Sequence, residues 1–291
     1  MHKAGFVNII GSPNVGKSTL MNGLVGERVS IITSKHQTTR HRIMGIVNGD
    51  DFQIVYSDTP GVLKPHYKLQ ESMMNFVSLA LTDADVILFV TDIFENEMNH
   101  PETFERLQKT DVPILLLINK IDLKDQARME ERVKYWSEKL PKAQILPISA
   151  LHKLNLDFVF NKIIELLPEN PPYFDKEALT DKPLRFFVSE IIREKILQNY
   201  DKEIPYSCEV VVESYKEEPN ITKIEAIIYV SRDSQKGIMI GHQGSRLKKV
   251  GTEARLDIEE FIGKKVFLKL DVKVDKDWRE TETKLKRFGY N

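Results

Sequence analysis

The sequence is poor in cysteine and has no long apolar run. Its 291 residues include one cysteine, Cys208, so no disulfide can close within the chain and no cysteine-rich metal site can form. No apolar run approaches the roughly 20 residues that span a bilayer, and the residues after Met1 lead into a strand pattern rather than a signal peptide. These absences predict a cytoplasmic protein in which Cys208 is a small core residue.

The sequence also lacks an excess of either positive or negative charge. The chain carries 42 lysines and arginines against 43 aspartates and glutamates, a formal net charge of −1. Overall charge therefore favours no class of partner, and partners must be inferred from local motifs. The length exceeds one comfortable hydrophobic core and predicts about two domains.

Proline marks the boundary between these domains. Pro168, Pro171 and Pro172 follow a helical pattern of apolar residues over 154–167 and cannot continue that helix. Strand and helix patterns alternate before this point, which predicts an α/β fold, a mostly parallel sheet with helices on both faces. The predicted parts are a first domain at 1–167, a linker at 168–182 and a second domain at 183–291.

A phosphate-binding pattern stands between the first predicted strand and the first predicted helix. The run Gly11-Ser12-Pro13-Asn14-Val15-Gly16-Lys17-Ser18 matches G-x-x-x-x-G-K-[ST]. In such a loop backbone N–H groups face the phosphates, the lysine reaches the β- and γ-phosphates, and the hydroxyl binds Mg²⁺. The predicted phosphate-binding residues are Gly11, Ser12, Pro13, Asn14, Val15, Gly16, Lys17, Ser18 and Thr19.

Two later segments predict that the base is guanine. Asn119-Lys120-Ile121-Asp122 follows the apolar strand pattern at 112–118. The Asp122 carboxylate can pair with the N1–H and the exocyclic amine of guanine, a donor pair that adenine lacks. This argues against the alternative of an ATP-using P-loop kinase. The predicted guanine-binding residues are Asn119 at the base edge, Lys120 over the ring, Asp122, and Ser149 and Ala150 near guanine O6.

A third pair of segments predicts a switch. Asp58-Thr59-Pro60-Gly61 ends a strand pattern, so that Asp58 can hold Mg²⁺ through water and the Gly61 N–H can sense the γ-phosphate. In Gln37-Thr38-Thr39-Arg40, Thr39 is the favoured Mg²⁺ ligand and Thr38 the alternative. Ordering of such loops by the γ-phosphate is the usual basis of a GTPase switch. The predicted switch residues are Thr38, Thr39, Asp58, Thr59, Pro60 and Gly61, and the predicted Mg²⁺ ligands are Ser18, Thr39 and Asp58.

These segments resemble the motifs of translation-factor-like GTPases, which identifies the first domain as a P-loop GTPase domain. One departure from the Ras-like pattern concerns hydrolysis, because Val62 stands where a glutamine could orient the attacking water. GTPases with this substitution share an asparagine in the phosphate loop, here Asn14, that binds K⁺ beside the phosphates. Arg40 as an arginine finger is the less favoured alternative. Intrinsic turnover is expected to be slow.

The second domain has a different pattern. A helix is predicted at 184–200, strands at 206–214 and 221–231, and a short helix ending at Ile240. The run Gly241-His242-Gln243-Gly244 then precedes a long helical pattern and a last strand. The order α-β-β-α-α-β with G-x-x-G between the last two helices resembles a type II KH domain, an α+β fold. Its glycines let a loop approach a nucleic-acid backbone, while an adjoining apolar groove receives unpaired bases.

Charge around this loop agrees with RNA binding. Between residues 232 and 249 five basic residues stand against one acidic residue, Asp233, an excess that suits a track of phosphates. A helix–turn–helix with a solvated basic face is the alternative. The predicted RNA-binding residues are Ile240, Gly241, His242, Gln243, Gly244, Arg246, Lys248 and Lys249.

The two domains together resemble the Era family of GTPases. The phosphate loop, the run Gln37-Thr38-Thr39-Arg40-His41-Arg42, the Asp58–Gly61 motif and the KH pattern carry the resemblance, and Asp277-Trp278-Arg279 and Phe288-Gly289-Tyr290 are also similar. The resemblance covers the whole chain. It implies a GTPase that binds the 3′ end of small-subunit ribosomal RNA, acts late in assembly of that subunit, and attaches peripherally to the inner face of the cytoplasmic membrane. A monomer is expected.

These observations lead to a timer hypothesis. GTP orders the segments around Thr39 and Gly61, RNA binds tightly in that state, and hydrolysis releases the protein. Two alternatives remain: an RNA-binding protein in which GTP is structural, and a membrane-remodelling GTPase, which the lack of a long apolar or basic amphipathic helix disfavours.

Overall fold

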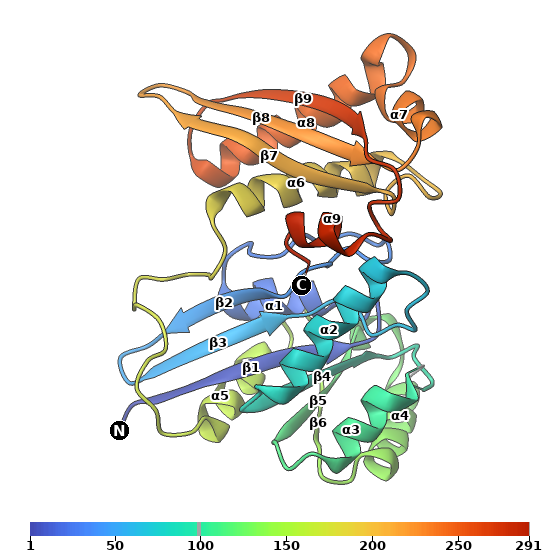
Figure 1. Cartoon of the computed structure of the whole chain (residues 1–291). Coiled ribbons are helices and arrows are strands. Elements are labelled where there is room, and N and C mark those ends of the chain that lie inside the picture. Colours follow the sequence, from blue (N-terminus) through green and yellow to red (C-terminus); the bar gives the residue numbers. More distant parts are fainter. Residues whose placement is uncertain (98–99, 291) are drawn as a thin grey trace. The chain divides into compact units, whose positions relative to one another are not determined.

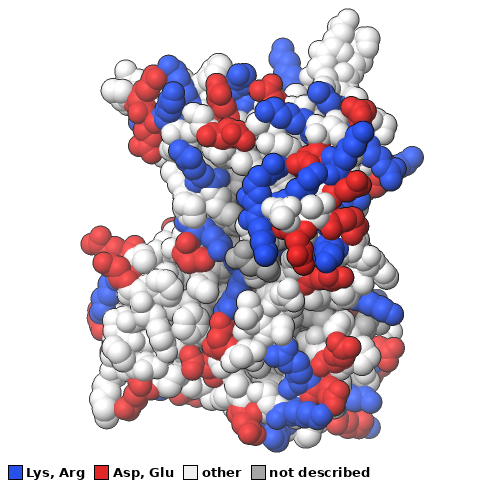
Figure 2. All heavy atoms as spheres, viewed as in Figure 1, with Lys and Arg blue, Asp and Glu red and all other residues white. Residues whose placement is uncertain are grey.

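The chain folds into two compact units, each with its own sheet (Figure 1). The computed structural model describes residues 1–97 and 100–290. The first unit contains Met1–His66 and Gln70–Asp181, and the second contains Lys182–Asn291 and Tyr67–Leu69. On the face drawn in Figure 2, basic and acidic side chains are interspersed in both units, in keeping with the balanced charge of the sequence.

The first unit is built on a six-stranded sheet in the order β2-β3-β1-β4-β5-β6. Its neighbouring strands are parallel, apart from the antiparallel pair β2 and β3, which confirms the predicted α/β fold. Every residue of β4 and β5 is buried, because helices cover both faces of the sheet and such strands become continuously apolar. The strands are β1 Lys3–Gly11, β2 Ile43–Asn48, β3 Phe52–Asp58, β4 Val86–Asp92, β5 Ile114–Asn119 and β6 Gln144–Pro147.

Helices flank both faces of this sheet (Figure 1). One face packs against α2, α3 and α4 in a core that includes Val77, Phe89, Leu107 and Trp136. The other face packs against α1 and α5, where Gly23 of α1 lies against Leu156 of α5. The helices are α1 Lys17–Val25, α2 Lys68–Thr82, α3 Pro101–Lys109, the 3₁₀ turn η1 Ile121–Leu123, α4 Gln126–Lys139 and α5 Leu156–Leu166.

The segment 168–181, which the sequence analysis places in a linker, runs along the edge of this sheet. The Ile46 N–H donates to the Leu179 carbonyl at 2.8 Å, and Gly45 and Thr180 form an antiparallel bridge. The buried Gln53 side chain accepts hydrogen bonds from the backbone N–H groups of Tyr173 and Phe174 at 2.7 and 3.0 Å. The segment is therefore held to the first unit up to Asp181.

The second unit has the predicted order α-β-β-α-α-β, which confirms the α+β KH fold. Strand β8 pairs antiparallel with β7 and parallel with β9. Cys208 is buried in the core between this sheet and its helices, and its thiol donates to the Pro205 carbonyl at 3.4 Å. A further helix, α9, follows and was not predicted. The elements are α6 Leu184–Asn199, β7 Cys208–Glu217, β8 Thr222–Val230, α7 Asp233–Ile240, the 3₁₀ turn η2 His242–Gly244, α8 Ser245–Ile262, β9 Val266–Val274 and α9 Glu282–Arg287. None of the described helices is long and apolar enough to cross a membrane.

Candidate functional site

The phosphate loop connects the end of β1 to the start of α1 in a conformation that requires its glycines. A Cβ on Gly11 would lie 2.0 Å from the Val90 carbonyl oxygen, and one on Gly16 would lie 2.3 Å from Asn119 Nδ2. Gly16 also has a φ of 98° and caps α1 without a side-chain hydrogen bond. The first N–H groups of α1 therefore stay available for an anion.

Lys17 lies inside this loop, with only 6% of its surface exposed. Its Nζ donates to the carbonyl oxygens of Gly11 at 3.1 Å and Ser12 at 2.8 Å. Burial lowers the pKa of Lys17 to about 8, and the nearby carboxylates of Asp58 and Glu95 oppose that shift. A bound phosphate chain adds negative charge beside Nζ and so favours the protonated lysine further.

Three predicted Mg²⁺ ligands lie together at the start of α1. Ser18 Oγ donates to Asp58 Oδ2 at 2.7 Å and lies 2.9 Å from Thr39 Oγ1, which is 3.3 Å from Asp58 Oδ2. Asp58 is buried, its Oδ1 has no hydrogen-bond partner among the described residues, and burial raises its pKa. Hydroxyl and carboxylate oxygens are the ligands that Mg²⁺ prefers, so the set fits this ion.

The two switch threonines differ in their surroundings. Thr38 Oγ1 donates to the Lys35 carbonyl at 2.7 Å and contacts Thr33 Oγ1 at 2.6 Å, whereas Thr39 lies beside Ser18 and Asp58. The geometry thus favours Thr39 over Thr38 as the metal ligand.

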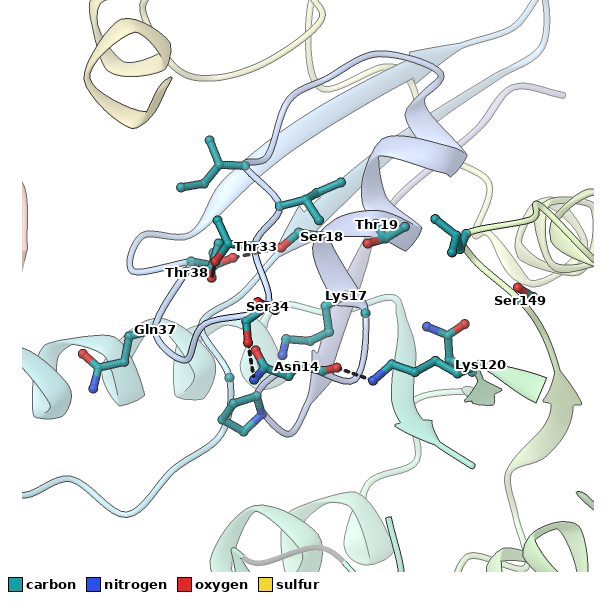
Figure 3. A pocket seen from close by; sticks show the side chains of 18 of the residues that line it. Asn14, Lys17, Ser18, Thr19, Thr33, Ser34, Gln37, Thr38, Lys120 and Ser149 are labelled. Atoms are coloured by element: carbon teal, nitrogen blue, oxygen red, sulfur yellow. Dashed lines mark hydrogen bonds between the residues drawn. The ribbon is translucent and has the colours of Figure 1, made fainter. Parts of the chain in front are cut away.

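The predicted motifs surround one cavity of about 580 Å³ (Figure 3). It is lined by residues of the phosphate loop, of the segment 31–39, of the turn after β5 and of the turn after β6. Figure 3 shows Lys17, Ser18 and Thr38 on one side of the cavity and Lys120 and Ser149 on the other. The residues with a predicted site role that line this cavity are Pro13, Asn14, Gly16, Lys17, Ser18, Thr19, Thr38, Thr39, Gly61, Asn119, Lys120, Asp122 and Ser149.

Asn119 connects two loops of the candidate site. Its Nδ2 donates to the Val15 carbonyl at 2.8 Å, and its Oδ1 accepts the Ala150 N–H at 2.9 Å. The buried amide thus joins the phosphate loop to the turn after β6, and because Nδ2 carries a second N–H and Asn119 lines the cavity, its contact with the guanine edge stays a prediction. Asp122 lines the cavity, and its pairing with guanine stays a prediction.

Lys120 bridges two parts of the site. Its Nζ donates to the Asn14 carbonyl at 2.6 Å and to Asp92 Oδ2 at 2.7 Å (Figure 3). Asp92, at the end of β4, was missed by the sequence analysis. Because parallel strands end at one edge of the sheet, its position at the end of an apolar run was the available signal.

Glu95 is a second missed residue. Its carboxylate accepts hydrogen bonds from the Ser12 hydroxyl in the phosphate loop and from Thr91 Oγ1, the latter at 2.7 Å. Burial raises the pKa of Glu95. Glu95 belongs to no motif and lies 83 residues from Ser12 in sequence, so nothing in the sequence connects the two.

The residues that follow Asp58, together with Asn14 and Arg40, bear on how hydrolysis proceeds without a water-orienting glutamine. Val62 is buried in the core beside α2, and its N–H donates to the Gly11 carbonyl at 3.0 Å. A Cβ on Gly61 would lie 2.7 Å from Pro13 Cα, so a glycine is needed for this close approach. Asn14 has a φ of 64°, and its Nδ2 donates to the Ser34 carbonyl at 3.1 Å (Figure 3). Arg40 is fully buried and is not among the residues that line the cavity.

The G-x-x-G loop of the second unit forms the turn η2 between α7 and α8. Gly241 and Gly244 have φ angles of 74° and 75°, and the His242 and Gln243 side chains are exposed. A groove of about 350 Å³ adjoins the loop. Of the predicted RNA-binding residues, Gly244 and Lys248 line it, Ile240 packs on the core, and the Arg246 guanidinium lies 6.0 Å from the Tyr200 ring. The groove residues that the sequence analysis missed are Leu247, Gly251, Thr252, Arg255, Leu268 and Leu270.

The fold and the two sites define a P-loop GTPase joined to a KH domain. A family model described as a 50S ribosome-binding GTPase matches residues 6–120, and a KH domain model matches residues 203–279. GTPase Era of Alkaliphilus metalliredigens is 45% identical over 294 residues, covering 99% of each chain, and GTPase Era of Thermoanaerobacter pseudethanolicus is 44% identical over 293 residues, covering 99% of this chain and 97% of the relative. The chain belongs to the Era family of GTPases.

Solved structures of this family match along the whole chain. A crystal structure of Era in complex with MgGDPNP and nucleotides 1506-1542 of 16S ribosomal RNA has a TM-score of 0.95 at 39% identity, covering 100% of this chain and 99% of that one. A variant of Aquifex aeolicus Era bound to GDP·AlF4⁻ has a TM-score of 0.93 at 39% identity, covering 99% of both chains.

Proposed function

We propose that this protein is a GTP-hydrolysing switch that binds the single-stranded 3′ end of small-subunit ribosomal RNA and assists late assembly of the small ribosomal subunit. The observation that carries the proposal is the cavity at which the phosphate loop, Thr39 and the Asn119–Asp122 turn meet, with Asp58 hydrogen-bonded to Ser18 beside it. Further support comes from the Era structure that holds MgGDPNP and nucleotides 1506-1542 of 16S ribosomal RNA.

GTP lies in this proposal with its phosphates against the N–H groups of loop 11–18 and the Lys17 ammonium, and with its guanine against Asp122. Ser18, Thr39 and Asp58 hold Mg²⁺, which neutralises charge on the β- and γ-phosphate oxygens. The Gly61 N–H senses the γ-phosphate. The preorganised donors of the loop stabilise the charge that develops during phosphoryl transfer.

We assign the remaining positive charge to a K⁺ ion at Asn14. Val62 is apolar and buried, so it cannot orient the attacking water. Arg40 is less favoured as a finger because its side chain is buried and lines no part of the cavity. K⁺ in place of Na⁺ at equal ionic strength is expected to raise turnover, and Asn14→Ala is expected to remove the difference.

RNA binds in this proposal at the G-x-x-G loop and the adjoining groove. Backbone N–H groups between Gly241 and Gly244 face phosphates, and the groove formed by α8 and β9 takes unpaired bases. Strand β9 is one of the two edge strands of its sheet, so its outer backbone groups are available to the base edges.

The proposal also includes a cytoplasmic monomer with peripheral attachment to the inner face of the cytoplasmic membrane. The family resemblance supports the attachment. Co-sedimentation with anionic lipid vesicles and sedimentation velocity test the two statements; protein that stays in the supernatant, or that sediments as a dimer, would contradict them.

A phosphate-release assay combined with RNA binding tests the proposed function. We expect Mg²⁺-dependent release of phosphate from GTP and not from ATP, and binding of a single-stranded RNA that copies the 3′ end but not of the same RNA annealed to its complement. The burial of Val62 favours one alternative, an RNA-binding assembly factor in which GTP is structural. RNA binding without GTP turnover in K⁺ would select that alternative.

A further inference from the structure

Arg42 lies at the junction between the switch segment and the sheet. It follows the predicted metal ligand Thr39 by three residues and directly precedes β2. Its side chain is 10% exposed. A guanidinium with this little exposure needs hydrogen-bond partners, since an unpaired charge away from water is costly.

Four hydrogen bonds satisfy the Arg42 guanidinium. Nη1 and Nη2 donate to the two carboxylate oxygens of Asp83 at 2.6 and 3.0 Å, a bidentate pair. Nε donates to Ser57 Oγ at 2.6 Å, and Nη2 also donates to Asn8 Oδ1 at 3.2 Å. Asn8 in turn donates to Asp83 Oδ1 at 2.7 Å and to the Ala80 carbonyl at 2.6 Å. One side chain thus joins β1, β3 and the residue after α2.

This network adjoins the predicted metal site through the backbone. Ser57, which accepts from Arg42, is the residue before Asp58. In the antiparallel pairing of β2 and β3, Ile43 is the partner of Asp58 and Met44 the partner of Ser57. The first residues after Arg42 are therefore fixed in register beside the metal-binding carboxylate.

The anchor limits how far the switch segment can move. Three residues span at most about 10 Å when fully extended, so Thr39 stays within that reach of Arg42. If Arg42 is released, the end of β2 can fray, and the segment that carries Thr39 gains length and freedom. The Thr39 hydroxyl would then meet Ser18 and Asp58 less often.

We propose that Arg42 is a positioning residue for Mg²⁺ binding: through Asp83 and Ser57 it fixes the carboxyl end of the switch segment so that Thr39 lies beside Ser18 and Asp58. The inference rests on the proposed GTPase function, and it assigns to Arg42 an indirect effect on the Mg²⁺ affinity of the GTP site. Arg42 does not touch nucleotide or metal in this role. It acts only through the chain that it holds.

Arg42→Gln and Asp83→Asn test the proposal, with Arg106→Gln as the matched control. Arg106 also binds the carboxyl-terminal part of α2, through Ser78 and Thr82, but has no contact with the switch segment among the described residues. The first readout is the Mg²⁺ concentration that half-maximally slows dissociation of a fluorescent, non-hydrolysable GTP analogue, because the γ-phosphate is what orders the segment that carries Thr39. The second is backbone hydrogen exchange of residues 37–41 with Mg²⁺ and a non-hydrolysable GTP analogue.

We expect Arg42→Gln to need about tenfold more Mg²⁺, because the bidentate charge-assisted hydrogen bonds to Asp83 and the hydrogen bond to Ser57 are lost. Nucleotide affinity in EDTA is expected to stay unchanged, and exchange at 37–41 to become faster. Asp83→Asn should also raise the Mg²⁺ requirement and speed exchange at 37–41, but by less than Arg42→Gln does. This second variant keeps the test valid if Arg42→Gln folds poorly. Arg106→Gln should match the wild type.

Two results would overturn the inference. One is a lower melting temperature in the Arg42 and Asp83 variants with an unchanged Mg²⁺ requirement, which assigns the network to stability alone. The other is an equal shift in Arg106→Gln. A wild-type protein that binds the GTP analogue with no Mg²⁺ dependence would overturn the proposed function as well, and so is distinguishable from either.

Discussion

We propose that Asp122 decides which base is bound. It lines the cavity beside the turn after β5 and offers a carboxylate to the donor pair of guanine. An amide at this position reverses one donor–acceptor pairing, so Asp122→Asn should bind xanthosine nucleotides and lose about 100-fold or more in affinity for GTP. A competition assay with GTP and xanthosine triphosphate measures this. Retained preference for guanine would show that the base lies elsewhere.

Glu95 is a second single residue whose replacement has a predictable effect, because its carboxylate lies beside the phosphate loop and interacts with Lys17. Glu95→Gln removes a negative charge near the bound phosphates, and we expect GDP to bind roughly three- to tenfold more tightly. Ser12→Ala is the control that removes the hydrogen bond and keeps the charge. A weaker affinity in Glu95→Gln would mean that the hydrogen bond matters more than the charge.

The same carboxylate predicts a pH dependence. Burial raises the pKa of Glu95, so the group becomes neutral at a higher pH than an exposed glutamate does. As pH falls through that raised pKa, the repulsion of phosphate weakens and GDP affinity should increase. Affinity measured over a pH series in wild type and Glu95→Gln checks this, since the variant should lack that component. An identical pH profile in both proteins would contradict it.

Motifs at strand ends could be predicted from the sequence, whereas contacts between distant residues could not. The phosphate loop, the Asp58 turn and the Asn119 turn each follow an apolar strand, and parallel strands bring their carboxyl ends to one edge. Asn119 shows the limit, because its hydrogen bonds to Val15 and Ala150 depend on the packing of three loops. Glu95 shows the same limit, because it belongs to no motif and its hydrogen bond to Ser12 joins residues 83 positions apart.

At the scale of elements, the loop between α7 and α8 depends on two glycines with positive φ. A Cβ on Gly241 would lie 2.8 Å from Arg246 Cγ at a φ of 74°. We expect Gly241→Ala to distort η2 and to weaken RNA binding about tenfold, with GTP turnover unchanged. The control is Gly237→Ala in helix α7, where no described atom beyond the neighbouring residues and the helix's own backbone lies within 4 Å of the added Cβ and alanine should stabilise the helix by about 0.5–1 kcal/mol. RNA titrations and melting curves measure both, and equal RNA affinities would refute the assignment of the loop.

Helix α9 and the edge segment show which elements the sequence did not predict. Helix α9 has only six residues, too few for a clear periodicity, and tertiary contacts hold it: Leu285 is buried and Tyr290 Oη donates to Glu209 Oε2 at 2.8 Å. Prolines correctly indicated that the chain leaves its helix near residue 168. The prolines did not indicate that the Gln53 side chain accepts hydrogen bonds from the backbone of residues 173 and 174.

At the scale of the molecule, each unit has its own buried core. Replacing Lys17 with alanine should therefore abolish GTP turnover, because the loop loses its phosphate-binding cation, while the second unit stays folded. Hydrogen exchange of residues 208–230 compared with the wild type checks the second part. Faster exchange throughout that sheet would mean that the two units do not fold independently.

Control of RNA binding by GTP can be measured with the intact protein. A short single-stranded RNA copying the 3′ end of small-subunit ribosomal RNA is titrated at fixed K⁺ and total salt, with GDP, with a non-hydrolysable GTP analogue and with no nucleotide. If GTP controls RNA binding, the RNA binds clearly more tightly with the analogue than in the other two states. Equal affinity in all three states would contradict it and leave a GTPase and an RNA-binding domain that act independently.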